Sequence, residues 1–460
     1  MKHYLAFDLG ATSGRALING EWRNENGEWE LLEIHRFSNT MIHKDGHIYW
    51  DWAQLWQEIK TGLTKAAQTG LEIESVGIDT WGVDVLFIGK DGHPLGNPYA
   101  YRDPQTSDAP ERFFRDIMPS GELYARTGIQ VMPINTLFQL YTLRERQDPM
   151  LMQADKILFL PDAFNYMLTG RMATEYTIAS TSQLLDARSR RLDTDLLHRI
   201  GLSEDLFAPM VEPGTYLGTI RPEIAEECGI PQWKVIAIAG HDTASAVAST
   251  HLTESYSIGC PFRGKPYGRG CASSTAYLSS GTWSLLGVEL DEPILTPEAQ
   301  QMNITNEGGI NGKIRFLKNI TGMWIVEGLK GDLSYDDIVR LAKESPCVCL
   351  INPDDSIFAA PESMQQAIDT YCAKHHLPQP KTHGEYLRCV FESLAHRYAE
   401  VLKMIQSLLP YTIEELHIIG GGSKNMFLNE LTAQATGLKV TAGPAEATTV
   451  GNILVQQICR

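Results

Sequence analysis

The sequence predicts an α/β protein made of two related halves. Short apolar runs typical of buried strands alternate along the chain with amphipathic segments typical of helices. The strand–turn–strand pattern of residues 5–18 recurs at residues 276–289, and such recurrence indicates a duplicated unit. The chain has 460 residues, more than one ordinary hydrophobic core supports. We therefore expect two domains, residues 1–247 and residues 248–460.

The first half is expected to hold five strands, each a short apolar or alternating run. These strands span residues 4–9, 14–19, 29–37, 75–81 and 234–239. Residues 52–68 carry apolar side chains at the spacing of one helical face, so they predict an amphipathic helix. Helices should dominate residues 103–200 as an insertion, with a turn near residues 160–162.

The second half shows the same order of signals. Residues 276–289 predict two strands around a small polar turn. Residues 415–425 predict a strand, a glycine turn and the start of a helix. The two halves match in the order of their predicted elements more than in the identity of their residues. This order supports two related domains that face each other across a cleft.

The composition excludes several classes of protein. A net charge of −17 argues against non-specific binding to nucleic acid, and no apolar stretch approaches the length of a membrane span. The N-terminus enters a strand directly, without the long apolar region of a signal peptide. The eight cysteines lack the spacing of zinc ligands. Together these features predict a cytoplasmic protein with reduced thiols and no membrane or nucleic-acid partner.

Asp242 is the first candidate for chemistry. It follows the apolar run of residues 234–239 and precedes small residues that predict a tightly packed helix. A single carboxylate at the end of a strand can take a proton from a substrate hydroxyl. Aspartate is also a preferred N-cap residue, so helix capping is the alternative.

Two predicted hairpin turns, residues 10–14 and 279–282, are rich in Gly, Ser and Thr. Such turns present backbone N–H groups and hydroxyls without bulk, as phosphate oxygens require. Ordinary hairpin chemistry explains either turn alone, but two turns at matched positions favour a phosphate site. Neither turn is followed by the Lys of a Walker loop. Asp8, which precedes the first turn, could hold Mg²⁺ through water or could cap that turn.

The three glycines at residues 420–422 follow a predicted strand. Without side chains, they allow a flat ligand such as adenine to lie directly on the backbone. A plain connection between strand and helix is the alternative.

Seven segments together resemble the FGGY family of carbohydrate kinases, which is related to actin, hexokinase and chaperone ATPases. They are residues 7–15, 77–84, 101–103, 240–247, 277–284, 303–309 and 418–422. The resemblance runs from residue 4 to about residue 452, nearly the whole chain. It is closest to the members of the family that act on L-rhamnulose, because of Gly-Ile-Asp-Thr-Trp-Gly-Val-Asp and Ser-Ser-Gly-Thr-Trp-Ser.

The resemblance implies two actin-like, ribonuclease H-like ATPase domains facing a central cleft. Residues 1–247 would bind the sugar and supply the base, and residues 248–460 would bind the nucleotide. The implied reaction is ATP-dependent phosphorylation of L-rhamnulose at O1, with Mg²⁺ accompanying ATP. L-Fuculose, xylulose or glycerol are alternative acceptors within the family. An actin-like or chaperone-type ATPase without a small acceptor is a further alternative, although no peptide-binding domain follows.

The resemblance also assigns roles to individual residues. Asp242 would be the general base. The phosphates of ATP would meet Ala11, Thr12, Ser13, Gly14 and Arg15, and the nucleotide would also meet Thr282, Glu327 and Gly421. The sugar would meet Gly82, His241, Asp242, Thr243 and Asn319, and Asp8 would face the metal. Glu327 departs from the family, whose members carry Gln there, and its hydrogen-bond donors differ accordingly.

Two further features depart from the family. Residues 251–274 form a longer link than usual, rich in Gly and without sustained periodicity, and we expect a surface loop there. That loop holds Cys260 and Cys271, which could pair on oxidation. The sequence ends at Arg460, where relatives continue for about one more helix, so we expect a shortened C-terminus.

Overall fold

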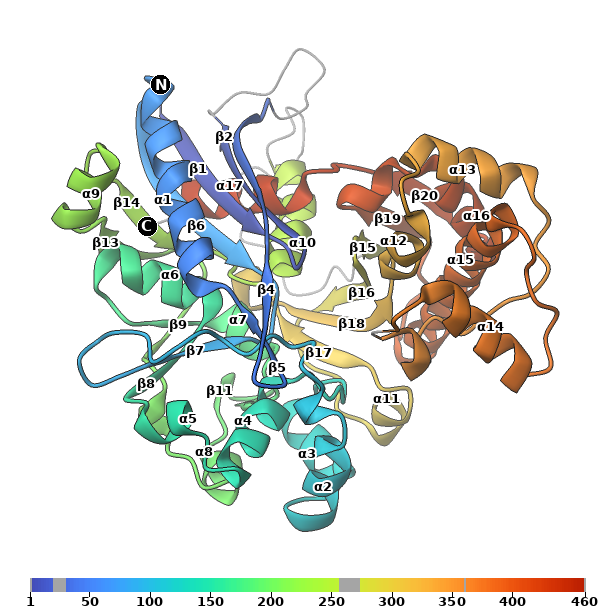
Figure 1. Ribbon diagram of the computed structural model, residues 1–460, viewed down its shortest axis with the longest axis horizontal. Helices are drawn as coiled ribbons and strands as arrows, with labels where there is room; N and C mark the ends of the chain where they lie inside the picture. The colour runs from blue at the N-terminus through green and yellow to red at the C-terminus, as the bar shows by residue number, and fades with distance from the viewer. Residues whose placement is uncertain (1, 20–29, 256–273, 360, 459–460) are drawn as a thin grey trace.

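The protein folds into two lobes, here described from a computed structural model (Figure 1). The structure describes residues 2–19, 30–255, 274–359 and 361–458. The first half of the chain forms one lobe, and most of the second half forms the other. No helix within these ranges is both long and apolar enough to cross a membrane.

The first lobe is built on a six-stranded sheet with the order β13-β14-β6-β1-β2-β3. Its strands are β1 (His3–Leu9), β2 (Ser13–Asn19), β3 (Leu32–Ser38), β6 (Ile73–Thr80), β13 (Thr215–Thr219) and β14 (Lys234–Ala237). The first three strands pair antiparallel, whereas β6 runs parallel to both β1 and β14. All five predicted strands of this half are confirmed, with small shifts at their ends.

The second lobe repeats this plan in a sheet with the order β17-β18-β16-β15-β19-β20. Its strands are β15 (Thr275–Ser280), β16 (Trp283–Leu290), β17 (Thr305–Gly308), β18 (Ile314–Thr321), β19 (Glu415–Ile419) and β20 (Lys439–Ala442). Here too an antiparallel hairpin, β15–β16, opens the sheet, and the strand after the long crossover, β19, runs parallel to the first. The duplication predicted from the sequence is therefore confirmed at the level of strand order.

The remaining strands are short and form small two-stranded sheets. They are β4 (Met41–Lys44), β5 (His47–Trp50), β7 (Val85–Ile88), β8 (Lys156–Phe159), β9 (Thr174–Glu175), β10 (Leu185–Asp186), β11 (Arg191–Leu192) and β12 (Met210–Val211). The helical insertion of the first lobe has its own apolar core.

Ten described α-helices belong to the first half and seven to the second. The former are α1 (Trp52–Gln68), α2 (Ala109–Asp116), α3 (Ser120–Thr127), α4 (Thr136–Glu145), α5 (Pro149–Gln153), α6 (Leu160–Thr169), α7 (Tyr176–Ser180), α8 (Thr194–Arg199), α9 (Pro222–Cys228) and α10 (Asp242–Ser255). The latter are α11 (Pro297–Gln301), α12 (Trp324–Lys330), α13 (Tyr335–Glu344), α14 (Met364–Lys374), α15 (His383–Leu408), α16 (Met426–Thr436) and α17 (Ala447–Gln457).

The predicted amphipathic helix has the expected bounds as α1. The Asp51 carboxylate accepts a hydrogen bond from the backbone N–H of Gln54 and so caps its first turn. Leu55, Ile59 and Leu63 lie on one face and are fully buried against the first sheet. Each of these side chains gains about 1.5–3 kcal/mol on burial, which explains why spacing alone predicts this helix.

Two local predictions were wrong. The turn expected near residues 160–162 is instead the first turn of α6, with Pro161 in a position where a helix needs no N–H donor. The loop expected over residues 251–274 begins later, because α10 continues through residues 251–255. The rest of that segment, including Cys260 and Cys271, lies outside the described residues.

The last helix, α17, returns to the first lobe and packs on α10, β1 and β6 (Figure 1). A Cβ atom at Gly451 would lie 1.7 Å from the carbonyl oxygen of Ser245 on α10, so only glycine allows this approach. Asn452 donates to Asp79 Oδ2 at 2.6 Å, and Gln456 donates to the Leu5 carbonyl at 3.0 Å. The boundary expected after residue 247 falls inside α10 and stays a prediction.

Candidate active site

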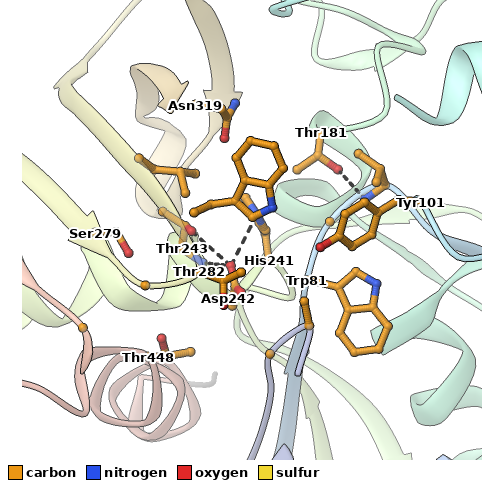
Figure 2. Close-up of a pocket in the computed structure, with 18 of the residues that line it drawn as sticks. Trp81, Tyr101, Thr181, His241, Asp242, Thr243, Ser279, Thr282, Asn319 and Thr448 are labelled. Carbon is orange, nitrogen blue, oxygen red and sulfur yellow. Dashed lines mark hydrogen bonds and ion pairs between the residues drawn. The ribbon is translucent and has the colours of Figure 1, made fainter. Parts of the chain in front are cut away.

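A cavity of about 360 Å³ lies where the two lobes meet. The β1–β2 turn, with Gly10 and Ala11, lines it from the first lobe. The β15–β16 turn, with Gly281 and Thr282, lines it from the second. Asp242 lies between these walls, with Trp81 and Tyr101 on one side and Ser279 and Thr448 on the other (Figure 2). The two predicted hairpin turns and the predicted carboxylate thus share one cavity.

Asp242 is positioned by the connection from β14 to α10. Glu175 Oε2 accepts a hydrogen bond of 2.9 Å from the backbone N–H of Gly240. The hydroxyl of Ser245 donates to the Ala239 carbonyl at 2.8 Å. These bonds fix the backbone on both sides of Asp242, which is the first residue of α10. Its side chain keeps 29% of its surface exposed and lines the cavity.

The carboxylate of Asp242 accepts hydrogen bonds from the next residue, Thr243, and not from the amides two and three residues further on, which an N-cap side chain would bind. Its Oδ1 accepts from the backbone N–H and the hydroxyl of Thr243, while the N–H of Ser245 bonds to the His241 carbonyl. Burial, followed by the negative charge of Asp8, raises the pKa of Asp242 to about 7. A carboxylate with a pKa near neutrality is a better proton acceptor than an ordinary one.

His241 lies beside Asp242 in a buried network that reaches into the second lobe. Its Nε2 is 3.4 Å from Asp242 Oδ1. Its Nδ1 is 3.0 Å from Nη2 of Arg315, which forms an ion pair of 3.1 Å with Glu307. Burial and then the positive charge of Arg315 hold the pKa of His241 well below its usual range. His241 is therefore a neutral imidazole near pH 7.

Asp8 lies close to the phosphate-type turn, where β1 ends. Its Oδ2 accepts a hydrogen bond of 2.6 Å from Nη2 of Arg15, and Nη1 of Arg15 pairs with Glu446. Asp8 and Asp79 occupy paired positions on the neighbouring strands β1 and β6. Burial and then the charge of Asp8 raise the pKa of Asp79 well above its usual range. Asp8 and Asp79 thus lie behind the β1–β2 turn, outside the residues that line the cavity, with Asp8 paired to Arg15.

The residues predicted to meet ATP divide between the cavity and its surroundings. Ala11, Ser13, Arg15, Thr282 and Gly421 line it. Thr12 is an exposed residue of the same turn, outside the lining. Gly14 is buried against Phe37, where a Cβ atom would lie 2.2 Å from the ring.

The three consecutive glycines, residues 420–422, differ in backbone angle and in what a side chain would meet. Gly420 has a φ of +83°, which disfavours any side chain. A Cβ atom at Gly422 would meet the Ser280 hydroxyl, whereas one at Gly421 would have nothing within 4 Å. Only Gly421 therefore presents bare backbone to open space on the cavity side.

Glu327 lies elsewhere, on an exposed face of α12 outside the cavity lining. Its carboxylate accepts a hydrogen bond from the hydroxyl of Tyr335. A nucleotide contact at Glu327 stays a prediction.

The residues predicted to meet the sugar all line the cavity: Gly82, His241, Asp242, Thr243 and Asn319. The Asn319 amide lies 3.3 Å from Gln130 Oε1 and 3.5 Å from Glu307 Oε1, and donates to both. Trp81 is 5% exposed and packs on Trp50 with 4.3 Å between ring centroids. The cavity thus combines polar groups on one side with an aromatic wall on the other.

The aromatic wall is held by a buried carboxylate, Asp84. Its Oδ2 accepts from the indole N–H groups of Trp50 at 2.6 Å and Trp81 at 2.9 Å, and from the Tyr101 backbone at 3.2 Å. Burial outweighs these bonds and raises the pKa of Asp84 to about 6. Trp81 is therefore both a core residue and a lining residue.

Several lining residues were not assigned from the sequence. Tyr101 and Glu307 belong to segments that carry the family resemblance, so a signal for them existed. Thr181, Thr448 and four residues of the insertion, Gln130, Met132, Ile134 and Asn135, also line the cavity. No local pattern marks these six residues, because only the packing of the insertion and of α17 brings them to the cleft.

No cluster of three or more metal-binding side chains occurs within the described ranges. Mg²⁺ does not require one, since it commonly uses one or two carboxylates together with substrate phosphates and water. Asp8 is a carboxylate beside the β1–β2 turn that lines the cavity, and such an oxygen donor fits this ion.

Family profiles match both halves of the chain. The N-terminal domain of the FGGY family of carbohydrate kinases matches residues 3–249, and its C-terminal domain matches residues 276–458. The chain belongs to the FGGY family of carbohydrate kinases. The fold and the kinase class expected from the sequence are therefore confirmed.

This FGGY kinase is 49% identical over 459 residues to a rhamnulokinase of Bacteroides thetaiotaomicron, covering 99% of this chain and 90% of that protein. It is 41% identical to a rhamnulokinase of Bacillus subtilis, with 99% and 90% covered. Among solved structures, a xylulose kinase from Lactobacillus acidophilus matches with a TM-score of 0.77 at 16% identity, covering 99% and 89%. Glycerol kinase of Plasmodium falciparum with ADP matches with a TM-score of 0.75 at 14% identity, covering 99% and 89%. The structural matches establish the fold alone.

Proposed function

We propose that this FGGY kinase transfers the γ-phosphate of ATP to O1 of L-rhamnulose, with Asp242 as the general base. The observation that carries the proposal is the position of Asp242 between the β1–β2 and β15–β16 turns in one cavity. The similarity of nearly the whole chain to rhamnulokinases supports the choice of ketose. A second acceptor within the family, such as L-fuculose, xylulose or glycerol, is the alternative that the test must separate.

The nucleotide would lie between the two turns. The amides and hydroxyls of Ala11, Ser13 and Thr282 line the space that phosphates would fill. The bare backbone at Gly421 offers a surface for a flat base. Residues 248–460 would supply most of the nucleotide contacts in this proposal, and residues 1–247 most of the sugar contacts.

The phosphates of ATP need neutralising charge, and Mg²⁺ bound with the nucleotide would supply it. Asp8 would face that ion. Arg15, held by Asp8 and Glu446, places a further positive charge beside the phosphate turn.

The ketose would lie against Trp81 of the aromatic wall, with its polar groups toward His241, Thr243 and Asn319. The Asp242 carboxylate accepts the proton of the O1 hydroxyl as the new P–O bond forms. Because the cavity lies between two lobes, their closure on both substrates would exclude water as a competing acceptor. We expect the enzyme to act in the cytoplasm.

Substrate profiling tests the proposal. ADP release is measured with L-rhamnulose, L-fuculose, D-xylulose, L-ribulose and glycerol, and the position of the new phosphate is read by ³¹P and ¹³C NMR. We expect the highest kcat/KM with L-rhamnulose, about 10- to 200-fold above that of a sugar without an apolar group to pack on the aromatic wall. A higher kcat/KM on xylulose or glycerol would leave only the family assignment standing.

A further inference from the structure

Arg315 is a buried cation with no place in the mechanism described so far. It lies on β18 of the second lobe and is 0% exposed. Its Nε donates to the Gly308 carbonyl at 2.8 Å, and its Nη2 meets Glu307 and His241. Its Nη1 is buried without a hydrogen-bond partner among the described residues. A buried ion pair that leaves one donor unpaired is poor evidence for a stabilising role.

The geometry around His241 decides where its proton lies. A guanidinium carries only donors, and Nη2 of Arg315 donates to Nδ1 of His241 at 3.0 Å. Glu307 Oε2 is also near Nδ1, but at 3.5 Å and without a hydrogen bond. In a neutral imidazole, an Nδ1 atom that accepts leaves the proton on Nε2.

The other nitrogen of His241 faces the chemistry. Nε2 is 3.4 Å from Asp242 Oδ1, and His241 lines the cavity beside Thr243 and Asn319 (Figure 2). The charged groups that meet the imidazole are therefore Asp242 from α10, Glu307 from β17 and Arg315 from β18. Two of these three belong to the second lobe, although His241 belongs to the first.

We propose that Arg315 is a positioning residue that holds the proton of neutral His241 on Nε2, so that His241 donates a hydrogen bond to a hydroxyl oxygen of the ketose. The ketose as the ligand rests on the proposed function, whereas the position of the proton does not. Held in this way, His241 is a donor and cannot compete with Asp242 for the substrate proton.

The test reads the proton directly. The full chain is labelled with [¹⁵N]histidine, and long-range ¹H–¹⁵N spectra distinguish protonated from bare ring nitrogens. The signals of His241 are assigned by their loss in His241→Asn. We expect a bare Nδ1 and a protonated Nε2 across about pH 6–8. A proton on Nδ1, or a doubly protonated ring in this range, would overturn the proposal.

Three variants separate positioning from packing. Arg315→Met removes the donor to Nδ1 and leaves Glu307 as the one charged group near that nitrogen among the described residues, so a larger share of the proton should move to Nδ1. The KM for the ketose should then rise about tenfold, the scale of one hydrogen bond, with the affinity for ATP unchanged. Arg315→Lys keeps a charged donor and should retain the Nε2 proton.

Lys318→Met is the matched control. Lys318 is another buried cation of β18, but its hydrogen bonds within the described residues go to the carbonyls of Met302 and Asn303. Its removal should leave the His241 spectrum and the KM for the ketose unchanged. An unchanged Nε2 proton in Arg315→Met, or an equal effect in Lys318→Met, would reduce Arg315 to a packing role and refute the proposal.

If Arg315→Met fails to fold, the double variant Arg315→Met/Glu307→Gln removes both buried charges together, a change that proteins often tolerate. It should give a mixture of the two tautomers, and a retained single Nε2 proton would refute the proposal. A parent enzyme with the expected tautomer but no activity on any ketose would refute the ketose as the ligand, and with it the proposed function. The assignment of the proton by Arg315 would still stand in that case.

Discussion

At the scale of single residues, Asp242 carries the strongest expectation. Asp242→Asn keeps the size of the side chain and removes the proton acceptor. We expect turnover to fall by about two or more orders of magnitude, the usual scale for loss of a general base. Steady-state kinetics measures the fall, and calorimetry should show nearly unchanged ATP affinity. A folded Asp242→Asn enzyme with near-normal turnover would return the residue to a structural role.

The pH dependence follows from the same residue. The pKa of Asp242 is raised to about 7, and only the ionised carboxylate accepts a proton. The kcat/KM for the ketose should therefore fall as pH drops through about 7. His241 stays neutral in this range because its pKa is lowered, so its titration adds no second inflection to the pH profile of kcat/KM. The residual activity of Asp242→Asn should not fall as pH drops through about 7. A fall that persists in this variant would point to another group, such as Glu175, whose burial raises its pKa to about 7.

At the scale of elements, the β1–β2 turn offers two contrasting glycines. A Cβ atom at Gly10 would meet only the Ser13 carbonyl oxygen, at 3.6 Å, so Gly10→Val should fold. Because Gly10 lines the cavity, the new side chain should intrude on the phosphates. We expect ATP affinity to weaken by about tenfold or more while the ketose still binds, since close phosphate approach needs a bare backbone.

Gly14 gives the contrast for that experiment. A side chain there would collide with Phe37, so Gly14→Val should lose stability, by about 1–3 kcal/mol. Calorimetry and thermal unfolding together distinguish the two effects. Unchanged ATP affinity in Gly10→Val would show that the turn serves only the hairpin.

The contact between α10 and α17 gives a second prediction at this scale. Gly451→Ala would place a methyl group against the Ser245 carbonyl oxygen and push α17 away from the helix that begins at Asp242. We expect a loss of about 1–3 kcal/mol in the free energy of unfolding, together with lower turnover. Chemical denaturation measures the first quantity.

Gly121→Ala on α3 is the control, because its Cβ atom would meet only Gln300, at 3.6 Å. A helical alanine is favoured over glycine by about 0.5–1 kcal/mol, so this variant should be neutral or slightly stabilised. If Gly451→Ala were equally neutral, the close approach of the two helices would be unimportant for stability.

At the scale of the whole molecule, Arg102 of the first half stacks on Trp324 of the second, with 4.1 Å from its guanidinium carbon to the ring centroid. It also donates to the Ala359 carbonyl at 3.3 Å. Arg102→Ala should remove a contact between the halves worth about 0.5–1 kcal/mol. We expect a more open molecule without substrates, seen as a larger radius of gyration in small-angle X-ray scattering.

Arg112 provides the comparison, since it stacks on Tyr141 within one lobe at 5.7 Å. Arg112→Ala should leave the radius of gyration unchanged. Equal scattering from Arg102→Ala and the parent enzyme would show that other contacts set the separation of the lobes.

Local patterns in the sequence did not mark β13, β17, β18 or β20 of the two main sheets. They determined the other eight strands of these sheets, α1, the two phosphate-type turns and Asp242 after β14. These features depend on neighbours in the chain, because periodic burial and turn chemistry act over a few residues. The start of α6 at residues 160–162 was misjudged, since a proline that marks a turn is equally suited to a first helical turn.

Tertiary structure alone decided what surrounds these features. The contact of Arg315 with His241 joins residues 74 positions apart, and α17 reaches the first sheet from the far end of the chain. No local pattern encodes such meetings, because they depend on how two folded sheets and their helices pack together. The sequence thus determined Asp242 and the two turns. Packing decided which residues line the cavity and which groups surround the imidazole of His241.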